Sequence, residues 1–454
     1  MTSPLPSEPP SLVNPAVPFG RAMREAYFGF SPDYTPINHG SYGTYPIPVR
    51  DALTTLRAEV EKAPDRFIVL EWPTRLQESR AAIAKMLNCE TDDLVFVPNA
   101  TTGSDTVFKN LKWEPGDVIL VYEFVYDAMR AGLAWLEETW DVRVEVVPLK
   151  IPLTDAEIVD AVVGAAKRVN RNENLESGKV RERVRMAIVD TIASLPGVRI
   201  PFEDLVPALQ AEGALVLVDG AHGIGHVDID LASLNPDFLV TSLNKWLFVP
   251  RGVSALYVPK RNQALIRTSL PTSHRFRRHA GEPGEPTNAF VDLFDFVATL
   301  DMTNFLMVKE ALAFRTQVCG GEAALRQYCQ SIVRKGAEAA LSIFGTEIMD
   351  SPDSRIRECN FANVRLPLDM AAEGEEINGE NGKIPLSHAA RVIQWFRETG
   401  VRESGCYTQL YVYYGAMWWR MSGMIYVDEE DFRKAAGMLK RLCERAARGE
   451  YLEA

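Results

Sequence analysis

The sequence has little that would assign the protein to a specialised class. Its six cysteines are scattered with no Cys-x-x-Cys pair, so we expect reduced thiols, no disulfide framework and no metal site. It contains no run of about 18 uncharged apolar residues, the length that a membrane helix needs. The Pro-rich start contains neither the basic nor the apolar segment of a secretory signal. Together these absences predict a cytoplasmic protein that does not bind a membrane.

The chain also has fewer basic than acidic residues. The chain has 49 Lys and Arg residues against 61 Asp and Glu, which gives a net charge of −12. Proteins that bind nucleic acids present a basic surface, so this balance argues against such a partner. With 454 residues, of which 46% are hydrophobic and 24% charged, the chain has the composition of a globular protein and can bury a large core. Size and composition favour an enzyme but indicate no chemistry.

The apolar pattern changes along the chain and suggests three parts. Residues 1–18 are rich in Pro and Ser and predict a flexible arm. Residues 19–305 predict a large α/β domain, with the segment 19–60 contributing to a second, smaller domain. Residues 306–454 predict that smaller domain, of α+β type.

Seven short apolar runs, each followed by a polar turn and a helical stretch, predict the strands of a mainly parallel sheet. They span residues 94–97, 118–122, 142–147, 186–189, 214–218, 238–240 and 255–258. Most are apolar at every position, which is typical of a sheet buried between helices. In 142–147, Arg143 and Glu145 alternate with valines, which predicts an exposed edge strand. The fold class is therefore α/β, with the sheet between two layers of helices.

Helical spacing and two polar segments complete the expected architecture. Helices are predicted at residues 51–60, 76–87, 308–319, 323–334, 336–344, 388–398 and 429–447, and a further strand at 360–366. Acidic residues at the start of 429–447 suit a helix N-terminus. We expect a solvated loop at the highly charged segment 167–185, and an acidic, Gly- and Asn-rich insertion at 371–383.

Two polar residues directly follow apolar strands of the predicted sheet. Asp219 ends the strand in ALVLVDGAHGIG (214–225), and ligands of open α/β sheets bind where strands end. Alone, this aspartate is more simply explained as a helix cap or turn residue. Lys245 follows the next strand, in FLVTSLNKWLFVPR (238–251), where apolar neighbours would favour a neutral, nucleophilic amine. Alone, it is more simply explained as an ordinary surface lysine.

A third segment has the character of a phosphate site. The turn 99–104 (NATTGS) lies between a strand and a helix, which places backbone N–H groups and hydroxyls at a helix N-terminus. An ordinary N-cap is an equally good explanation for this turn alone. Pyridoxal 5′-phosphate requires such a set of groups: a cradle for its phosphate, a carboxylate for its ring nitrogen and a lysine for its aldehyde.

The same segments carry a resemblance to a known family. The chain resembles the class V aminotransferases of the fold-type-I pyridoxal phosphate enzymes. More narrowly, it is similar to isopenicillin N epimerase-like proteins, hercynylcysteine sulfoxide lyases and a class V enzyme of loline biosynthesis. The matching stretches are INHGSYGTYP (37–46), NATTG (99–103), VDGAHGIGHVDI (218–229), the surroundings of Lys245, LIRTSLPTSH (265–274) and WWRMS (418–422).

The resemblance implies a role for each matching position. Lys245 would form the Schiff base with the cofactor and move protons at the substrate Cα, and Asp219 would pair with the ring nitrogen. His222 would lie beside the ring, and Tyr126 would stack on it or act as an acid, although each could be a structural residue instead. The remaining cofactor contacts would come from Ala100, Thr101, Thr102, Ser242 and Asn244, and from Thr299 across a homodimer interface. Arg420 would bind the substrate carboxylate, and the site would be lined by Asn38, His39 and Ser41.

The sequence departs from the family pattern at two places. Asn244 stands where the family usually has a histidine next to the lysine, and the lyase pattern Tyr-Gly-Ala-Cys is replaced by Tyr126, Asp127, Ala128 and Met129. Because both changes fall in the expected site, we expect a different substrate from that of the lyases. Asp127 would offer a carboxylate to a cationic substrate and is a third candidate catalytic residue.

These departures lead to an expected reaction that is not a transamination. The first expectation is Mannich-type ring closure in alkaloid-type secondary metabolism, in which the substrate Cα carbanion attacks an iminium carbon. The alternative is C–S β-elimination from a cysteine sulfoxide conjugate. Transamination or epimerisation ranks third, and a non-catalytic scaffold is a remote fourth reading.

Overall fold

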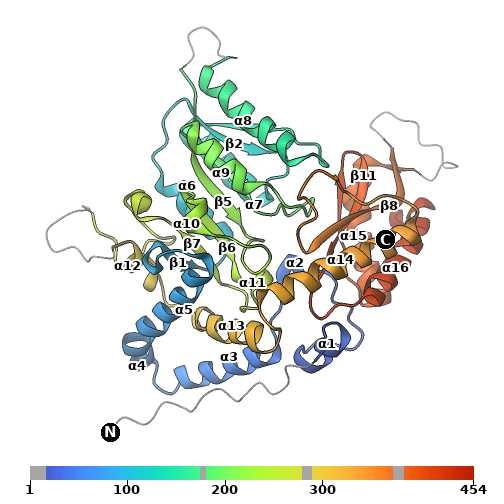
Figure 1. The fold of residues 1–454 in the computed structure, drawn as a ribbon, viewed down its shortest axis with the longest axis horizontal. Helices are drawn as coiled ribbons and strands as arrows, with labels where there is room; N and C mark the ends of the chain where they lie inside the picture. The colour runs from blue at the N-terminus through green and yellow to red at the C-terminus, as the bar shows by residue number, and fades with distance from the viewer. Residues whose placement is uncertain (1–16, 174–179, 279–288, 372–382, 454) are drawn as a thin grey trace.

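The computed structural model describes residues 17–173, 180–278, 289–371 and 383–453. Nearly all of the predicted N-terminal arm and of the acidic insertion therefore lies outside the described residues. A large sheet occupies the middle of the molecule, and the C-terminal elements form a separate block beside it (Figure 1).

All seven predicted strands are confirmed. They are β1 (Leu94–Val97), β2 (Asp117–Tyr122), β3 (Arg143–Val147), β4 (Arg183–Asp190), β5 (Leu215–Gly220), β6 (Phe238–Ser242) and β7 (Ser254–Tyr257). They form one sheet in the order β1-β7-β6-β5-β4-β2-β3. The β2–β3, β2–β4, β4–β5 and β5–β6 pairs are parallel, and β7 is antiparallel to both of its neighbours. The predicted edge strand is confirmed as well, because β3 ends the sheet with its first four residues partly or fully exposed.

The sheet is buried on both faces because alternate side chains of each strand enter different apolar clusters. Leu94 and Phe96 of β1 pack in one cluster, whereas Val95 and Val97 pack in the other. The first cluster includes apolar residues of α8 (Asp155–Arg171) and α9 (Phe202–Ala211), and the second those of α6 (Ala100–Asn110) and α7 (Asp127–Trp140). Full burial explains why these strands are apolar at nearly every position.

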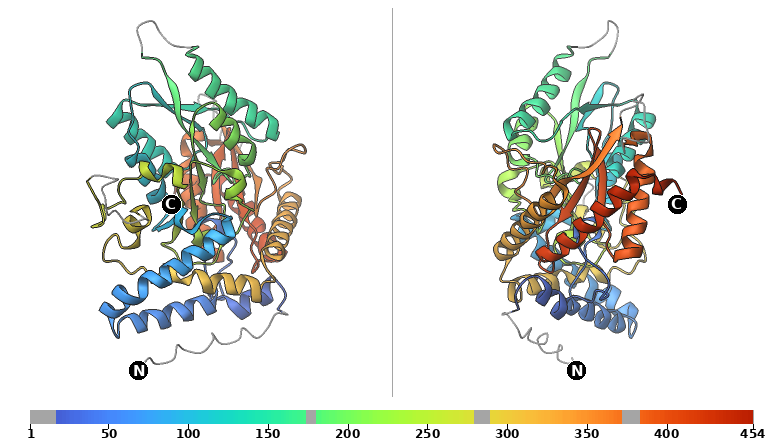
Figure 2. Two further views of the ribbon diagram at one scale, coloured as in Figure 1. Left: turned by 60° about the vertical axis from the view of Figure 1, so that its left-hand side comes forward. Right: turned by 90° about the vertical axis from the view of Figure 1, so that its right-hand side faces the viewer.

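Further helices lie before residue 320 in the described ranges, and some of them contact β1 at one edge of the large sheet. They are α1 (Arg21–Tyr27), α2 (His39–Tyr42), α3 (Ile47–Val60), α4 (Pro64–Arg66), α5 (Trp72–Leu87), α10 (Leu231–Leu234), α11 (Leu243–Trp246), α12 (Ala289–Asp295) and α13 (Val308–Gln317). The long helices α3, α5 and α13 lie side by side in both views of Figure 2. The predicted helices at 51–60, 76–87 and 308–319 are confirmed within these bounds.

The C-terminal block is a smaller sheet packed against helices. Its strands are β8 (Phe361–Ala371), β9 (Ile384–Pro385), β10 (Gln409–Tyr413) and β11 (Ala416–Ser422), in the order β10-β11-β8-β9. Its helices are α14 (Glu322–Phe344), α15 (Ala389–Ser404) and α16 (Glu429–Ala447). The N-terminal segment joins this block, because Arg24 of α1 donates two hydrogen bonds of 3.0 Å to Asp431 of α16. The boundary at residue 305 stays a prediction.

Three expectations about the chain are wrong in detail. The helices predicted at 323–334 and 336–344 form one helix, α14. Gly336 lies within it, and a Cβ at that position would lie 2.3 Å from the ring of Phe432, so glycine allows α16 to pack closely. The segment 167–185 is not all loop, since its first five residues end α8 and its last three begin β4. Strands β10 and β11 were not predicted, and the strand at 360–366 continues to Ala371.

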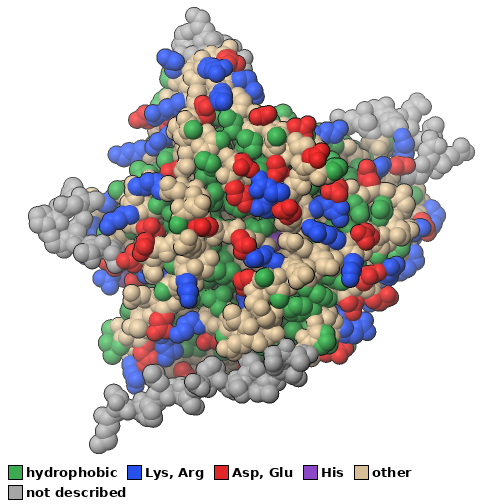
Figure 3. Space-filling view, viewed as in Figure 1, with side chains coloured by type: hydrophobic (Ala, Val, Ile, Leu, Met, Phe, Trp, Pro, Cys, Tyr) green, Lys and Arg blue, Asp and Glu red, His purple; other side chains and the backbone are tan. Residues whose placement is uncertain are grey.

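Two general expectations can be compared with the described residues. All six cysteines are free, and five of them are buried. Within the described ranges, no helix combines the length and the apolar composition needed to cross a bilayer. Acidic and basic side chains are intermixed over the face of the molecule in Figure 3.

Candidate active site

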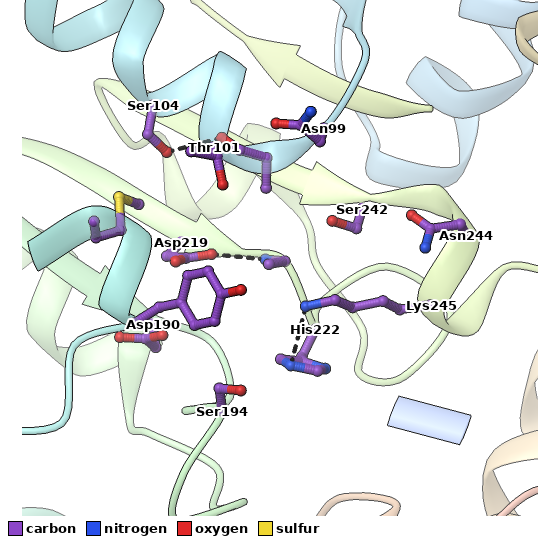
Figure 4. Close-up of a pocket in the computed structure, with 14 residues that line it drawn as sticks. Asn99, Thr101, Ser104, Asp190, Ser194, Asp219, His222, Ser242, Asn244 and Lys245 are labelled. Carbon is purple, nitrogen blue, oxygen red and sulfur yellow. Dashed lines mark hydrogen bonds between the residues drawn. The ribbon is translucent and has the colours of Figure 1, made fainter. Parts of the chain in front are cut away.

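A cavity of about 160 Å³ opens where the central strands of the large sheet end. Segments that follow β1, β2, β4, β5 and β6 all contribute to its wall, which is the expected place for a ligand in such a sheet. The lining residues are Asn99, Ala100, Thr101, Ser104, Tyr126, Met129, Asp190, Ser194, Asp219, Ala221, His222, Ser242, Asn244 and Lys245 (Figure 4). The cavity thus brings together eight of the residues predicted from the sequence.

The N-terminus of α6 forms one end of the cavity. Asn99 caps this helix, since its Oδ1 accepts hydrogen bonds from the amide of Thr102 at 2.8 Å and from the hydroxyl of Thr102 at 3.0 Å. The amides of the first turn, including those of Ala100 and Thr101, have no acceptor within the helix and can bind an anion. Thr102 itself serves the cap and does not line the cavity.

Glycine at position 103 brings the helix close to the sheet. A Cβ on Gly103 would lie 2.8 Å from Cγ1 of Val240, in β6. Only glycine therefore lets the N-terminus of α6 reach the strand that leads to Ser242 and Lys245. The cradle for a phosphate and the lysine are positioned by the same contact.

Lys245 lies in the single turn α11, and burial controls its chemistry. Its Nζ is 3.2 Å from Nε2 of His222, while the indole N–H of Trp246 donates to Nδ1 of the same histidine at 3.1 Å. Burial lowers the pKa of Lys245 to about 8, against the opposing effect of the carboxylate of Asp219. Burial and the nearby ammonium lower the pKa of His222 well below its usual range. Because Nδ1 accepts the indole proton, the neutral His222 carries its own proton on Nε2, facing Lys245.

Asp219 ends β5 and is almost fully buried. Its Oδ1 accepts a hydrogen bond of 2.9 Å from the amide of Ala221. Burial raises its pKa, while the Ala221 amide and the ammonium of Lys245 favour the charged form. A helix N-terminus, a buried carboxylate and a lysine of lowered pKa around one cavity are the donor set that fits pyridoxal phosphate.

Arg420 projects from the middle of β11 toward the large sheet. It is 2% exposed. Its guanidinium donates to the carbonyl of Ser194 at 2.9 Å and to the hydroxyl of Ser41 at 2.9 Å, with Asn38 Oδ1 at 3.4 Å. No carboxylate within the described ranges forms an ion pair with it, and burial lowers its pKa to about 10. A buried guanidinium without a counter-charge is costly, so this one is suited to an anionic ligand.

Three further predicted residues lie outside the first cavity, and Tyr126 lies at its rim. His39 is buried, with its Nδ1 2.5 Å from the hydroxyl of Tyr426, and burial lowers its pKa to about 3. Asp127 is exposed at the start of α7 and does not line the cavity. Thr299 is exposed too, so its predicted contact with a second subunit stays a prediction. Tyr126 is 46% exposed at the rim, with its ring centre 5.9 Å from Nζ of Lys245.

A second cavity, of about 310 Å³, adjoins the Arg420 region. Asn38 lines it and contacts the guanidinium, and His39 and Tyr426 line it as well. The other lining residues are Phe30, Tyr34, Pro36, Tyr42, Gly43, Thr44, Val401 and Tyr407. Its wall is thus largely aromatic and, among its lining residues, carries no lysine, arginine or carboxylate side chain.

Sequence reasoning missed Asp190 and Ser194, which both line the first cavity. Asp190 ends the apolar strand β4 as Asp219 ends β5, so the argument used for Asp219 would have found it. Ser194 binds Arg420 through its carbonyl oxygen, and the sequence carries no signal for a contact of that kind.

Comparisons with known proteins agree with this donor set. Residues 69–282 match the family model "Aminotransferase class-V". The chain is 33% identical over 447 residues to an L-cysteine desulfhydrase-like protein, lolT1, of Epichloe uncinata, covering 94% of this chain and 96% of that protein. The chain belongs to the class V aminotransferase family. The family uses pyridoxal phosphate, so this member is a pyridoxal phosphate-dependent enzyme.

Other relatives of this class V enzyme include lyases. It is 28% identical to the hercynylcysteine sulfoxide lyase of Schizosaccharomyces pombe, over 94% of this chain and 98% of that protein. Among solved structures, the cystine C–S lyase C-DES in complex with cysteine persulfide has a TM-score of 0.66 at 19% identity, covering 91% of this chain and 98% of that one. The structural likeness confirms the predicted fold.

Proposed function

We propose that this enzyme removes the Cα proton of an α-amino acid whose carboxylate binds to Arg420, and that the reaction is not a transamination. The observation that carries the proposal is the buried guanidinium of Arg420, without a counter-charge in the described residues and close enough to disfavour the charged form of Lys245. A carboxylate bound there would hold the substrate Cα beside the amine.

The residues of the first cavity would hold the cofactor and move the proton. Lys245 would bind its aldehyde, Asp219 its ring nitrogen, and the amides of Ala100 and Thr101 with Ser242 its phosphate. When bound, pyridoxal phosphate withdraws electrons from the bonds at the substrate Cα. Lys245, displaced from the cofactor by the substrate, would accept the Cα proton as a neutral amine. His222, whose Nε2 lies 3.2 Å from Nζ of Lys245, would lie beside the amine and limit its movement.

Ring closure is the first candidate for the step that follows. The Cα–H bond breaks, its proton goes to Lys245, and Cα forms a bond to an iminium carbon of the same substrate, whose nitrogen takes the electron pair. The second cavity supports this candidate, because it offers aromatic walls to a bulky or cationic side chain next to the carboxylate site. The similarity to the lolT1 protein and the resemblance to a loline-pathway enzyme support it as well.

C–S β-elimination is the second candidate, and the names of the relatives favour it. After the Cα proton is removed, the Cβ–S bond would break, the sulfur would leave with its electron pair, and hydrolysis would release pyruvate and ammonia. No cysteine lines the first cavity, so a protein thiol there would not accept the sulfur. The sulfur would therefore leave as a small molecule.

Proton exchange in heavy water tests the proposal before any product is known. Holoenzyme is incubated in D₂O with L-cysteine, cystine, an S-alkylcysteine sulfoxide and an N-alkylated cationic amino acid, and the Cα–H signals are followed by NMR. We expect exchange with at least one of them in the wild-type enzyme, and none with Lys245→Ala. Lys109→Ala, on the exposed face of α6, is the matched control and should exchange normally.

Product analysis then separates the two candidates. A ring-closed product found by mass spectrometry supports the first candidate, and pyruvate with a released sulfur compound supports the second. The proposal is wrong if none of the probes loses its Cα–H signal, or if Lys245→Ala exchanges as fast as the wild-type enzyme. A purified protein that cannot be loaded with cofactor would favour the scaffold reading instead.

A further inference from the structure

Two buried carboxyl groups lie side by side beneath the first cavity. Asp190 and Asp219 are the last and next-to-last residues of the parallel strands β4 and β5, and they are direct partners in the register of those strands. Neighbouring strands are about 4.8 Å apart, so the two side chains start from adjacent points of the sheet. They are 3% and 4% exposed, and both line the cavity (Figure 4).

Asp190 is held by a tyrosine on the other neighbouring strand. The hydroxyl of Tyr122, in β2, is 2.6 Å from Oδ2 of Asp190 and accepts the Asp190 amide proton at 2.5 Å. Since that hydroxyl accepts the N–H, its own proton is directed to Oδ2. Tyr122 thus donates to one oxygen of Asp190, which by itself favours the charged form, and Oδ1 is the oxygen left to carry a proton. Burial and the carboxylate of Asp219 have the larger effect, and they raise the pKa of Asp190 well above its usual range.

The charges around the pair favour only one ionised carboxylate. Lys245 is a cation that favours the charged form of both aspartates, and its own pKa is raised more by Asp219 than by Asp190. The other titratable groups facing them are neutral at pH 7, because burial lowers the pKa of His222 and raises that of Tyr122. Two buried carboxylates this close repel each other strongly, so their protons leave in separate steps.

We propose that Asp190 is protonated at neutral pH and that Asp219 carries the only negative charge of the pair. The Asp190–Tyr122 unit is then a positioning device: a neutral acid, oriented by a tyrosine, next to the carboxylate that faces the cofactor's ring nitrogen. Without this proton, a second negative charge would compete with Asp219 for Lys245 and for the ring nitrogen. The proposal depends on the cofactor site alone and holds for either reaction considered above.

Infrared spectroscopy of the holoenzyme without substrate tests the protonation directly. A protonated carboxylic acid has a carbonyl stretching band that carboxylates and amides lack. We expect the wild-type enzyme to show a buried acid band at pH 7 and the Asp190→Asn variant to lack it. Asp160→Asn, an exposed position of α8, is the matched control and should leave the band unchanged. Equal spectra for wild type and Asp190→Asn would overturn the proposal.

The cofactor's visible absorbance gives a second readout. Asparagine is neutral and has nearly the shape of protonated aspartic acid, so Asp190→Asn should keep the pH at which the visible band titrates close to the wild-type value. Asp190→Glu, which displaces the carboxyl group from Tyr122, should shift that pH. A shift of about one pH unit or more in Asp190→Asn would mean that a charge had been removed, and the proposal would then be wrong. Because no substrate is added, this outcome is independent of whether the proposed reaction is correct.

Discussion

The two sheets supply different parts of the proposed site and position them by different means. The large sheet supplies Lys245 and Asp219, each directly after a buried strand, so that the order of strands brings them together. The small sheet supplies Arg420 from within β11, and contacts with residues 38–41 and 194–197 and with the ring of Phe361 orient it. The comparison suggests that the positions of Lys245 and Asp219 are set by the order of strands in the large sheet. The position of Arg420, and with it substrate binding, is set by how the C-terminal block packs against that sheet.

We expect the largest effect on substrate binding from replacing Arg420, the residue that the small sheet supplies. Arg420→Gln should raise KM for the amino-acid substrate by about 10- to 150-fold, because hydrogen bonds to a charged group contribute about 1.5–3 kcal/mol. Cofactor binding should be retained, since Arg420 does not line the first cavity, but the pH at which the visible band titrates should rise, because a positive charge that disfavours the ammonium of Lys245 is removed. Steady-state kinetics and absorbance measure the two effects. Arg433→Gln, on the exposed face of α16, is the control, and loss of cofactor binding in Arg420→Gln would contradict the division between the sheets.

A change in the turn that packs on Arg420 should act in the same direction. A Cβ on Gly197 would lie 2.8 Å from Cγ and Cδ of Arg420 and 2.9 Å from the ring of Phe361. Gly197→Ala should therefore displace the guanidinium and cost about 1–3 kcal/mol, as overpacking does. Thermal unfolding measures the loss of stability, and KM measures the effect of the displaced guanidinium on substrate binding. Gly164→Ala in α8, where a Cβ meets only the end of the Arg168 side chain, should leave KM unchanged and should not lower the unfolding temperature, since alanine favours a helix more than glycine does. An unaltered KM in Gly197→Ala would show that the turn does not position Arg420.

On the side of the large sheet, cofactor attachment should depend on pH. The neutral amine of Lys245 attacks the aldehyde, and its pKa is lowered to about 8. In the apoenzyme, attachment should therefore become about tenfold faster per pH unit below pH 8 and level off above it. Stopped-flow absorbance after adding pyridoxal phosphate measures the rate. Asp219→Asn removes the carboxylate that favours the ammonium, so the midpoint should move to lower pH, and a move to higher pH would refute this account of the lysine.

Asp127 should give the smallest effect. The sequence suggested that its carboxylate serves a cationic substrate, but the side chain is exposed at the start of α7 and outside the first cavity. We expect Asp127→Asn to change kcat/KM by less than about twofold, in line with surface substitutions away from a site. Competition between the variant and the wild-type enzyme for one substrate measures such small changes well. A tenfold or larger loss of kcat/KM would show that the carboxylate of Asp127 does take part in the site.

The same comparison shows why prediction from sequence succeeded unevenly. The strands of the large sheet are buried on both faces, so their apolar runs were visible in the sequence. β10 and β11 were missed because aromatic and polar residues are mixed in them. They form a hairpin with each other, but the other partner of β11, β8, lies far away in the chain, with Arg420 paired to Asn363. Two helices were predicted where α14 is one continuous helix, in which Gly336 lets Phe432 pack closely.

By itself, the sequence determined the fold class, the seven strands of the large sheet, and the aspartate and lysine that follow two of them, because these depend on residues close together in the chain. The tertiary structure decided which polar groups share a cavity. It placed Asp190 beside Asp219, left Arg420 buried with no counter-charge among the residues that the structure describes, and put Asp127 and Thr299 on the surface. Burial and the distance between charges set the chemistry of such groups, and both arise only when distant segments pack together.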